Sequence, residues 1–222
     1  MDILDAIRER RSCRAFKPDP VPGAILKKIM EQALKAPSWA NTQPWEFAVV
    51  TGKPLKEIQD GFMARGVKNP TPDIHRPYEF PEPHMGRIRA LAPKGRAEMT
   101  QEEQEQRVLA NFEHYGAPAV IYILVGRNFF YQSQGINVWS IYDCGLACEN
   151  LMLAAVNEGL ATVVQAQAVT HPDIIRKVTG IPDSKLIAMG IAIGYPDWNA
   201  PRNERRSTRE SFDNVVTWYG SH

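Results

Sequence analysis

The chain has 222 residues and a mass of 25.0 kDa, with 44% hydrophobic and 23% charged residues, which are ordinary values for a globular domain. Its 26 Lys and Arg against 25 Asp and Glu give a formal net charge of +1, without the clear basic excess of a nucleic-acid-binding protein. No apolar run approaches the roughly 18 residues that span a bilayer. We therefore expect a single domain over residues 1–222, with neither nucleic acid nor membrane among its partners.

The sequence also predicts the compartment in which the protein works. Charges begin at Asp2 and no apolar stretch follows, so the N-terminus does not resemble a secretory signal. The three cysteines are too few and too scattered for a disulfide framework or a zinc site of CxxC type, and the five histidines show no metal-ligand spacing. We therefore predict a cytoplasmic protein without a bound metal.

The cysteines are expected to be packing residues. Cys144 and Cys148 lie four positions apart on a predicted helix, where their side chains point poorly for a disulfide bridge. Cys13 lies beside Arg11 and Arg14, a setting that lowers the pKa of reactive thiols. Packing next to a basic cluster is nevertheless the favoured interpretation of Cys13.

Hydrophobic periodicity predicts alternating helices and strands along the chain. Helices are expected over residues 2–11, 22–35, 55–64, 99–115, 137–157 and 170–178. Strands are expected over residues 46–51, 119–125, 162–169 and 186–193. The last helix has Thr170 as its expected N-cap. This order is typical of an α+β or α/β domain.

Residues 66–97 differ in character from the rest of the chain. Six prolines fall within 24 residues, at positions 70, 72, 77, 81, 83 and 93, and they forbid long regular structure there. Such a segment is either a linker or a long ordered loop, and long loops in compact domains are often functional lids. We group it with the polar helix that follows as a lid and insertion over residues 66–112.

The C-terminal segment after Pro196 is polar and rich in arginine, and then turns apolar. Its last apolar residues are Val215, Val216, Trp218 and Tyr219. An apolar end on a polar arm needs a surface that covers it. We therefore expect this arm to dock on another surface, such as a second subunit.

A basic cluster follows the first predicted helix. Arg10, Arg11, Ser12 and Arg14 lie within five residues, and Arg10 and Arg14 would share a face if the helix continued. Guanidinium groups and a hydroxyl suit a phosphate, because they offer bidentate and short hydrogen bonds. The alternative is a solvated helix end whose cations interact with the helix dipole.

A second polar cluster lies in residues 37–45, which read PSWANTQPW. Prolines bracket this loop and make it rigid, while Ser38, Asn41, Thr42 and Gln43 supply hydroxyl and amide groups. Amides can hydrogen-bond a planar heterocycle through both donors and acceptors. The alternative is a turn whose side chains bond one another. GxGxxG, GxxxxGK[ST], HExxH and GxSxG motifs are all missing from the sequence.

Together, these two clusters resemble the nitroreductase family of FMN-dependent oxidoreductases. They occur in the family's order and about 25 residues apart. The same resemblance extends to DCGLACENLMLAAVNEGL at residues 143–160, GIAIGYP at 190–196 and RESFDNVVTW at 209–218. It covers nearly the whole chain except roughly residues 66–112. It implies an α+β fold, with a central, mostly antiparallel sheet flanked by helices, in a homodimer that exchanges C-terminal arms.

The resemblance also implies roles for particular residues. Arg209 would close on the FMN phosphate, whose other ligands would be Arg10, Arg11, Ser12 and Arg14. A loop from the partner subunit would reach the flavin through Pro37, Ser38, Trp39 and Asn41. The stretch that passes the isoalloxazine edge, where a backbone N–H faces N5, would comprise Val164, Gln165, Ala166 and Gln167.

The implied activity is FMN-dependent oxidoreduction. NADPH or NADH would pass a hydride to flavin N5, and a nitroaromatic or quinone-like acceptor would then be reduced by a ping-pong mechanism, so that no catalytic side chain is required. Candidate acceptor-binding residues are Trp39, Tyr78, Phe80, Arg87 and Arg89. Two alternatives stay open: an enone- or halide-reducing flavoenzyme on the same scaffold, and a flavin-binding sensor or storage module without turnover.

Overall fold

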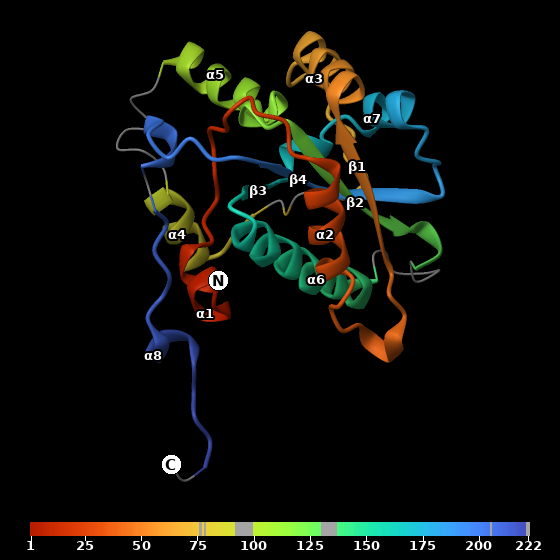
Figure 1. Cartoon of the computed structure of the whole chain (residues 1–222). Helices are drawn as coiled ribbons and strands as arrows, with labels where there is room; N and C mark the ends of the chain where they lie inside the picture. Colours follow the sequence, from red (N-terminus) through yellow and green to blue (C-terminus); the bar gives the residue numbers. More distant parts are fainter. Residues whose placement is uncertain (76, 78, 92–99, 130–136, 205, 221–222) are drawn as a thin grey trace.

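The structure is a computed structural model that describes residues 1–75, 77, 79–91, 100–129, 137–204 and 206–220. At its centre, the described residues form a four-stranded sheet of order β1-β2-β4-β3. Its strands are β1 (Trp45–Thr51), β2 (Ala119–Gly126), β3 (Ala161–Gln165) and β4 (Lys185–Gly194). All neighbouring strands pair antiparallel, and helices cover both faces of the sheet (Figure 1).

The central strand β2 shows why the sheet is buried on both sides. Every residue of β2 is buried, and its side chains alternate between the two faces. Tyr122 packs into one hydrophobic core, whereas Ile121 and Ile123 pack into the other. A strand covered on both faces needs a continuous apolar run, which is why this segment was predictable from its sequence.

One face of the sheet is covered by α2 (Gly23–Ala33) and α6 (Val138–Asn157). Their core residues include Leu26, Ile29, Ala147 and Leu151. Asn137 caps the start of α6, since its side-chain oxygen accepts hydrogen bonds from two backbone N–H groups of the first turn. The short helix α1 (Ile3–Glu9) contacts α6 from outside the core.

The opposite face is covered by α3 (Gly52–Arg65), α5 (Gln101–Phe112) and α7 (Pro172–Thr179). Their core residues include Leu55, Ile58, Phe62, Phe112 and Ile175. A capping box of Thr100 and Glu103 begins α5. Turns of 3-10 helix occur at Trp39–Asn41 (η1), His114–Gly116 (η2), Arg127–Phe129 (η3), Gln167–Val169 (η4) and Pro201–Asn203 (η5).

Two short helices lie outside these layers. α4 (His84–Leu91) occupies the proline-rich segment and buries none of its residues, and α8 (Phe212–Val215) lies on the C-terminal arm. The helix α4 fits between Pro83 and Pro93, because proline is tolerated just before a helix and after its end. Figure 1 shows the arm extending away from the body of the molecule. In the described part of the chain, no helix has the length and apolar character to cross a membrane.

Local backbone structure departs from expectation at three places. The first helix ends at Glu9, so Arg10 and Arg14 do not share a helical face. The strand expected over residues 162–169 ends at Gln165, since η4 follows it. The predicted cap Thr170 is wrong: the N-cap position of α7 is taken by His171, because the residue before a proline avoids helical geometry.

Candidate functional site

Residues 10–14 lie along the outer edge of β3. Ser12 forms a parallel bridge with Thr162, and the Cys13 N–H donates to the Thr162 carbonyl oxygen at 2.9 Å. β3 is the last strand of the sheet, so beyond this bridge its outer edge has no strand partner among the described residues. The structure thus brings two of the segments predicted to bind the cofactor, residues 10–14 and 164–167, to one edge.

Backbone donors are available along that edge. In a strand, the polar groups of alternate residues face the same side. Because the Thr162 carbonyl faces residue 13, the N–H of Val164 faces the open edge as well. The next alternate residue, Ala166, has an N–H without a hydrogen-bond partner in the described chain. Ala166 belongs to the stretch where the family resemblance implies a backbone donor to flavin N5.

Directly after the end of β3, η4 approaches β4 closely. Gln165 pairs with Gly190 at the last register position of β3. A Cβ at Gly190 would lie 2.6 Å from the Cβ of Ala168, which is closer than any real contact. Glycine at this position therefore lets the chain turn over β4 directly after the candidate donor Ala166.

The side chains of the basic segment keep donors available. Arg10 Nε lies 3.6 Å from a carboxylate oxygen of Glu149 on α6, and the Arg11 guanidinium lies 3.9 Å from the ring centroid of Trp198. A stacked guanidinium retains its in-plane N–H groups for an anion. The side chains of Ser12 and Arg14 have no hydrogen-bond partner among the described residues.

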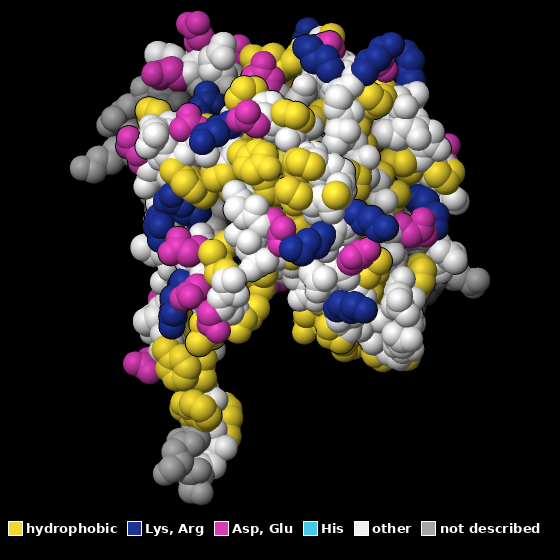
Figure 2. All heavy atoms as spheres, viewed as in Figure 1, with side chains coloured by type: hydrophobic (Ala, Val, Ile, Leu, Met, Phe, Trp, Pro, Cys, Tyr) yellow, Lys and Arg dark blue, Asp and Glu magenta, His cyan; other side chains and the backbone are white. Residues whose placement is uncertain are grey.

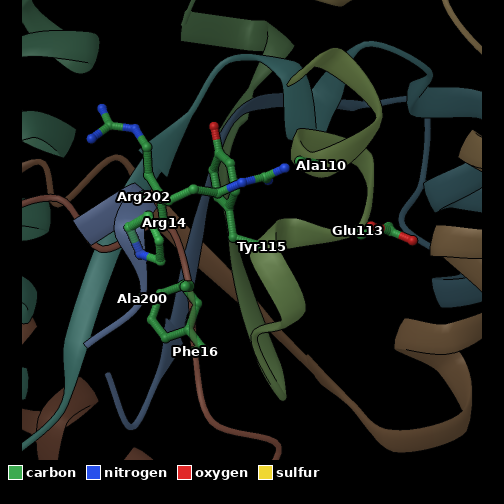
Figure 3. A pocket seen from close by; sticks show the side chains of 9 residues that line it. Arg14, Phe16, Ala110, Glu113, Tyr115, Ala200 and Arg202 are labelled. Carbon is green, nitrogen blue, oxygen red and sulfur yellow. The ribbon is translucent and has the colours of Figure 1, made fainter. Parts of the chain in front are cut away.

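A pocket of about 430 Å³ opens beside this segment. Figure 3 shows the ring of Tyr115 between the side chains of Arg14 and Arg202, which come from opposite ends of the chain. The pocket is lined by Arg14, Ala15, Phe16, Ala110, Glu113, Tyr115, Ala200, Pro201 and Arg202. Arg202 was not among the predicted site residues, because a single arginine in a polar segment carries no sequence signal.

Asn203 is a second residue that sequence reasoning missed. It is almost completely buried, and its Oδ1 accepts a hydrogen bond from the Arg14 N–H at 2.6 Å. Its Nδ2 donates to the Ala15 carbonyl oxygen at 2.9 Å and to the Asp197 carbonyl oxygen at 2.7 Å. Asn203 therefore ties the segment after β4 to the basic segment.

The structure does not bring Arg209 to residues 10–14. Its guanidinium donates to the Ser207 Oγ at 3.0 Å and to backbone carbonyl oxygens of Ser207 and Thr208. The arm approaches α1 three residues earlier, where Arg206 Nη2 lies 3.8 Å from Glu9 Oε2. The role of Arg209 therefore stays a prediction.

The loop that carries Trp39 is fixed by its own polar groups and by α6. The Trp39 N–H donates to Asp143 Oδ2 at 3.1 Å. Ser38 Oγ accepts from the Gln43 N–H at 3.0 Å, and Asn41 Oδ1 accepts from Gln43 Nε2 at 3.1 Å. These bonds leave the Trp39 side chain 64% exposed.

The same loop is strained and lies away from the basic segment of its own chain. Ala40, Asn41 and Gln43 have φ angles of 46°, 57° and 44°, which non-glycine residues rarely adopt outside functional sites. In Figure 1 the loop, drawn in orange at the lower right, lies far from α1 at the left. A single chain therefore does not bring residues 37–41 to residues 10–14.

The residues predicted to lie on a lid have partners of their own. The Arg87 Nε and Nη2 donate to Glu210 Oε2 on the arm, at 3.0 and 2.8 Å, and Arg89 pairs with Glu82. Hydrogen bonds from Asn214 and Arg87 lower the pKa of Glu210 to about 2. Phe80 is 41% exposed, and the predicted acceptor-binding residue Tyr78 lies outside the described residues.

The cysteines are buried thiols. Cys13 is fully buried, and its Sγ donates to the Ala15 carbonyl oxygen at 3.1 Å. Burial raises the pKa of Cys13, so packing, and not a lowered pKa, describes this residue. Burial also raises the pKa values of Cys144 and Cys148 to about 12. Within the described residues, no cluster of His, Cys, Asp and Glu could hold a metal ion.

This arrangement fits the cofactor that the sequence resemblance implies. The Arg11 and Arg14 guanidinium groups and the Ser12 hydroxyl suit a phosphate, and the N–H of Ala166 suits an acceptor atom on a planar ring. Ala166 lies four positions after Thr162, which corresponds to about 13 Å of extended strand. That separation leaves room for a ribityl chain between the phosphate donors and the ring donor.

The fold and site define an α+β protein with an antiparallel sheet and a basic site on the edge strand. The sequence profile of the Nitroreductase family matches residues 7–195, and the chain belongs to this family. The 4-nitrobenzoate reductase of Pseudomonas putida is 30% identical over 235 residues, covering 99% of this chain and 96% of that protein. The predicted family and fold class are confirmed.

Solved structures agree with this assignment. The FMN and NADPH-dependent nitroreductase NfnB from Sphigopyxis sp. strain HMH matches with a TM-score of 0.87 and 30% identity, covering 100% of both chains. The FMN-dependent nitroreductase NfnB from Mycobacterium smegmatis, in complex with NADPH, matches with a TM-score of 0.87 and 25% identity. It covers 99% of this chain and 100% of that chain.

Proposed function

We propose that this protein is an FMN-dependent NAD(P)H oxidoreductase that reduces a nitroaromatic or quinone-like acceptor by a ping-pong mechanism. Membership of the nitroreductase family supports the redox activity. Structural relatives described as FMN and NADPH-dependent, and sequence relatives named 4-nitrobenzoate reductase, support the cofactors and the acceptor class. When bound, FMN supplies the redox centre that takes up and gives back the hydride.

The observation that carries this proposal is the pairing of residues 12–13 with Thr162 on the edge of β3. In the proposed site, the cofactor phosphate is bound by Arg10, Arg11, Ser12 and Arg14, and Arg209 joins them. The backbone N–H of Ala166 orients the ring from its edge. The protein side chains bind and orient, and none acts as an acid or base.

The proposed enzyme is a homodimer, because large apolar side chains are exposed on the surface of the isolated chain. They occur on α1, at the start of α6 and on the arm, and they include Ile3, Leu4, Ile7, Val138, Trp139, Tyr142, Phe212, Val215, Trp218 and Tyr219. Figure 2 shows the arm as a largely apolar projection beside an apolar lower edge of the body. A second copy would cover these surfaces, and residues 37–41 would then reach the partner's cofactor.

The remaining organisation is proposed on the same basis. Residues 1–222 form one domain, and residues 66–112 are its lid and insertion, with Phe80, Arg87 and Arg89 near the acceptor. Trp39 would supply a stacking surface for a planar acceptor. The donor is NADPH or NADH, and the compartment is the cytoplasm.

Spectroscopy and turnover of the purified protein test this function. We expect a yellow protein whose heat-released cofactor has the mass of FMN. Anaerobic NADPH should bleach the colour, and 4-nitrobenzoate should restore it over many cycles, with parallel double-reciprocal plots. A protein that stays colourless after incubation with FMN contradicts the proposal. If only an enone or an organohalide restores the colour, the protein is a reductase for that other class of acceptor. If NADPH does not bleach the coloured protein, the result favours a flavin-binding sensor.

A further inference from the structure

His114 and Tyr115 form a strained turn between α5 and β2. Their φ angles are 51° and 55°, and non-glycine residues in this region store strain that persists only where surrounding contacts fix it. The His114 side chain has no exposed surface, and its ring lies 6.4 Å from the ring of Phe62. Contacts with neighbouring segments must therefore hold this turn in its conformation.

These contacts reach both segments assigned to the cofactor. The Phe16 N–H, two residues beyond Arg14, donates to the Tyr115 carbonyl oxygen at 3.2 Å. On the other side, His114 Nδ1 lies 3.3 Å from Gln165 Oε1, and Gln165 directly precedes Ala166. One turn thus connects the basic segment to the end of β3.

The hydrogen bonds around Gln165 define which atom donates and which accepts in each contact. Gln165 Nε2 donates to the Asn111 carbonyl oxygen at 3.2 Å, so its Oε1 is the acceptor toward His114. His114 Nδ1 must then carry the proton, and its buried Nε2 has no hydrogen-bond partner among the described residues. Tyr115 completes the cluster, since its hydroxyl donates to Asn111 Oδ1 at 2.8 Å. Burial lowers the pKa of His114 to about 4, so the ring is neutral near pH 7.

We propose that His114 is a positioning residue for the cofactor, because its hydrogen bond to Gln165 fixes the end of β3 and with it the N–H of Ala166. This inference rests on the proposed function. β4 is the only strand that pairs with this end of β3 among the described residues. The buried side chain of Gln165 adds an anchor from the sheet face that α5 covers, where it bonds His114 and Asn111.

The test compares His114→Leu with His114→Asn in the full-length protein. Leucine removes the donor, whereas asparagine keeps an N–H near the position of Nδ1 and tolerates positive φ. We expect His114→Leu to raise the Kd for FMN about tenfold, as the loss of a buried hydrogen bond predicts, and to shift the absorption bands of the bound flavin. His114→Asn should restore most of the affinity.

His171 supplies a matched control from the same aromatic cluster. It is also fully buried, and its ring lies 5.4 Å from that of Phe62. Its Nε2, however, lies 2.8 Å from the Gly66 carbonyl oxygen and does not contact Gln165. His171→Leu should lower the melting temperature while the Kd for FMN stays within twofold of the wild type.

Riboflavin lacks the phosphate, so comparing its binding with that of FMN distinguishes effects at the ring end of the site from effects at the phosphate end. If Gln165 anchors the ring-edge strand, Gln165→Met should weaken riboflavin and FMN by the same factor. This variant also carries the test if His114→Leu does not fold. An unchanged Kd in the folded variant, an equal effect of His171→Leu, or a loss confined to FMN overturns the inference. Wild-type protein that binds no FMN would instead contradict the proposed function.

Discussion

Cys13 donates its backbone N–H to the carbonyl oxygen of Thr162 at 2.9 Å. This hydrogen bond places the start of the chain beside the edge strand of the sheet. The adjacent Ser12 forms a β-bridge with the same threonine. Side-chain donors from residues 10–14 and backbone donors from residues 164–167 thereby meet at one edge. Predictions about the cofactor follow from this geometry.

Loss of either of two arginines proposed to bind the phosphate should weaken cofactor binding. Charge-assisted hydrogen bonds contribute about 1.5–3 kcal/mol each, so Arg14→Ala and Arg209→Ala should each raise the Kd for FMN roughly ten- to a hundredfold. Fluorescence titration of the apoprotein measures this change. Arg8→Ala is the control, because the partner of Arg8 in the described part of the chain is Asp5, on the exposed face of α1. Unchanged affinity in both variants would place the phosphate elsewhere.

Removal of the arm should separate the subunits and release the cofactor. Trp218 and Tyr219 are 64% and 91% exposed, and burial of such side chains stabilises an interface. Light scattering should give twice the chain mass of 25.0 kDa for the wild type, and a single-chain mass with loss of yellow colour after deletion of residues 210–222. Deletion of residues 220–222 alone should change neither. A truncated monomer that keeps its flavin would be incompatible with the arm-exchanged site.

The two arginines of the proposed lid, Arg87 and Arg89, should affect charged acceptors selectively. Arg87→Ala should raise the KM for 4-nitrobenzoate and leave that for a neutral quinone unchanged, because a guanidinium pairs with carboxylate or nitro oxygens. Glu210→Gln releases Arg87 from its partner and should lower the same KM. Arg65→Ala is the control, since Arg65 pairs with Asp173 between α3 and α7. Equal changes for both acceptors would exclude this recognition.

Stability should fall with acidity through His114. Burial lowers the pKa of His114 from 6.5 to about 4, so the unfolded chain binds more protons than the folded chain between these values. The contribution of neutral His114 to the free energy of unfolding is fully present above pH 6.5. It is lost as the pH falls toward about 4, by about 1.4 kcal/mol per pH unit. Urea unfolding should show a shallower pH slope for His114→Asn, and identical slopes would disprove this assignment.

The thiols should be unreactive in the folded protein. The pKa values of Cys144 and Cys148 are raised to about 12 and that of Cys13 is raised as well, chiefly by burial. Since the thiolate is the reactive form, DTNB at neutral pH should label the native protein slowly. All three cysteines should react at once in denaturant. Rapid labelling of one native thiol would indicate an accessible, activated cysteine.

The sequence predicted the elements whose residue pattern is local. The apolar run of β2 and the helical spacing of α2 appear where expected, because residues one to four positions apart decide such patterns. Motifs that are continuous in the chain, such as residues 10–14 and 37–45, were also enough to predict the family.

Tertiary structure alone decided which segments meet. The bond between Cys13 and Thr162, the buried anchor Asn203 and the contact of His114 with Gln165 join residues far apart in sequence. No periodicity encodes such contacts, since each requires two segments to be brought together by packing of the whole sheet. The same reason explains the end of α1 at Glu9: residues 12 and 13 use their backbone polar groups on an edge strand, and a helix cannot use them as well.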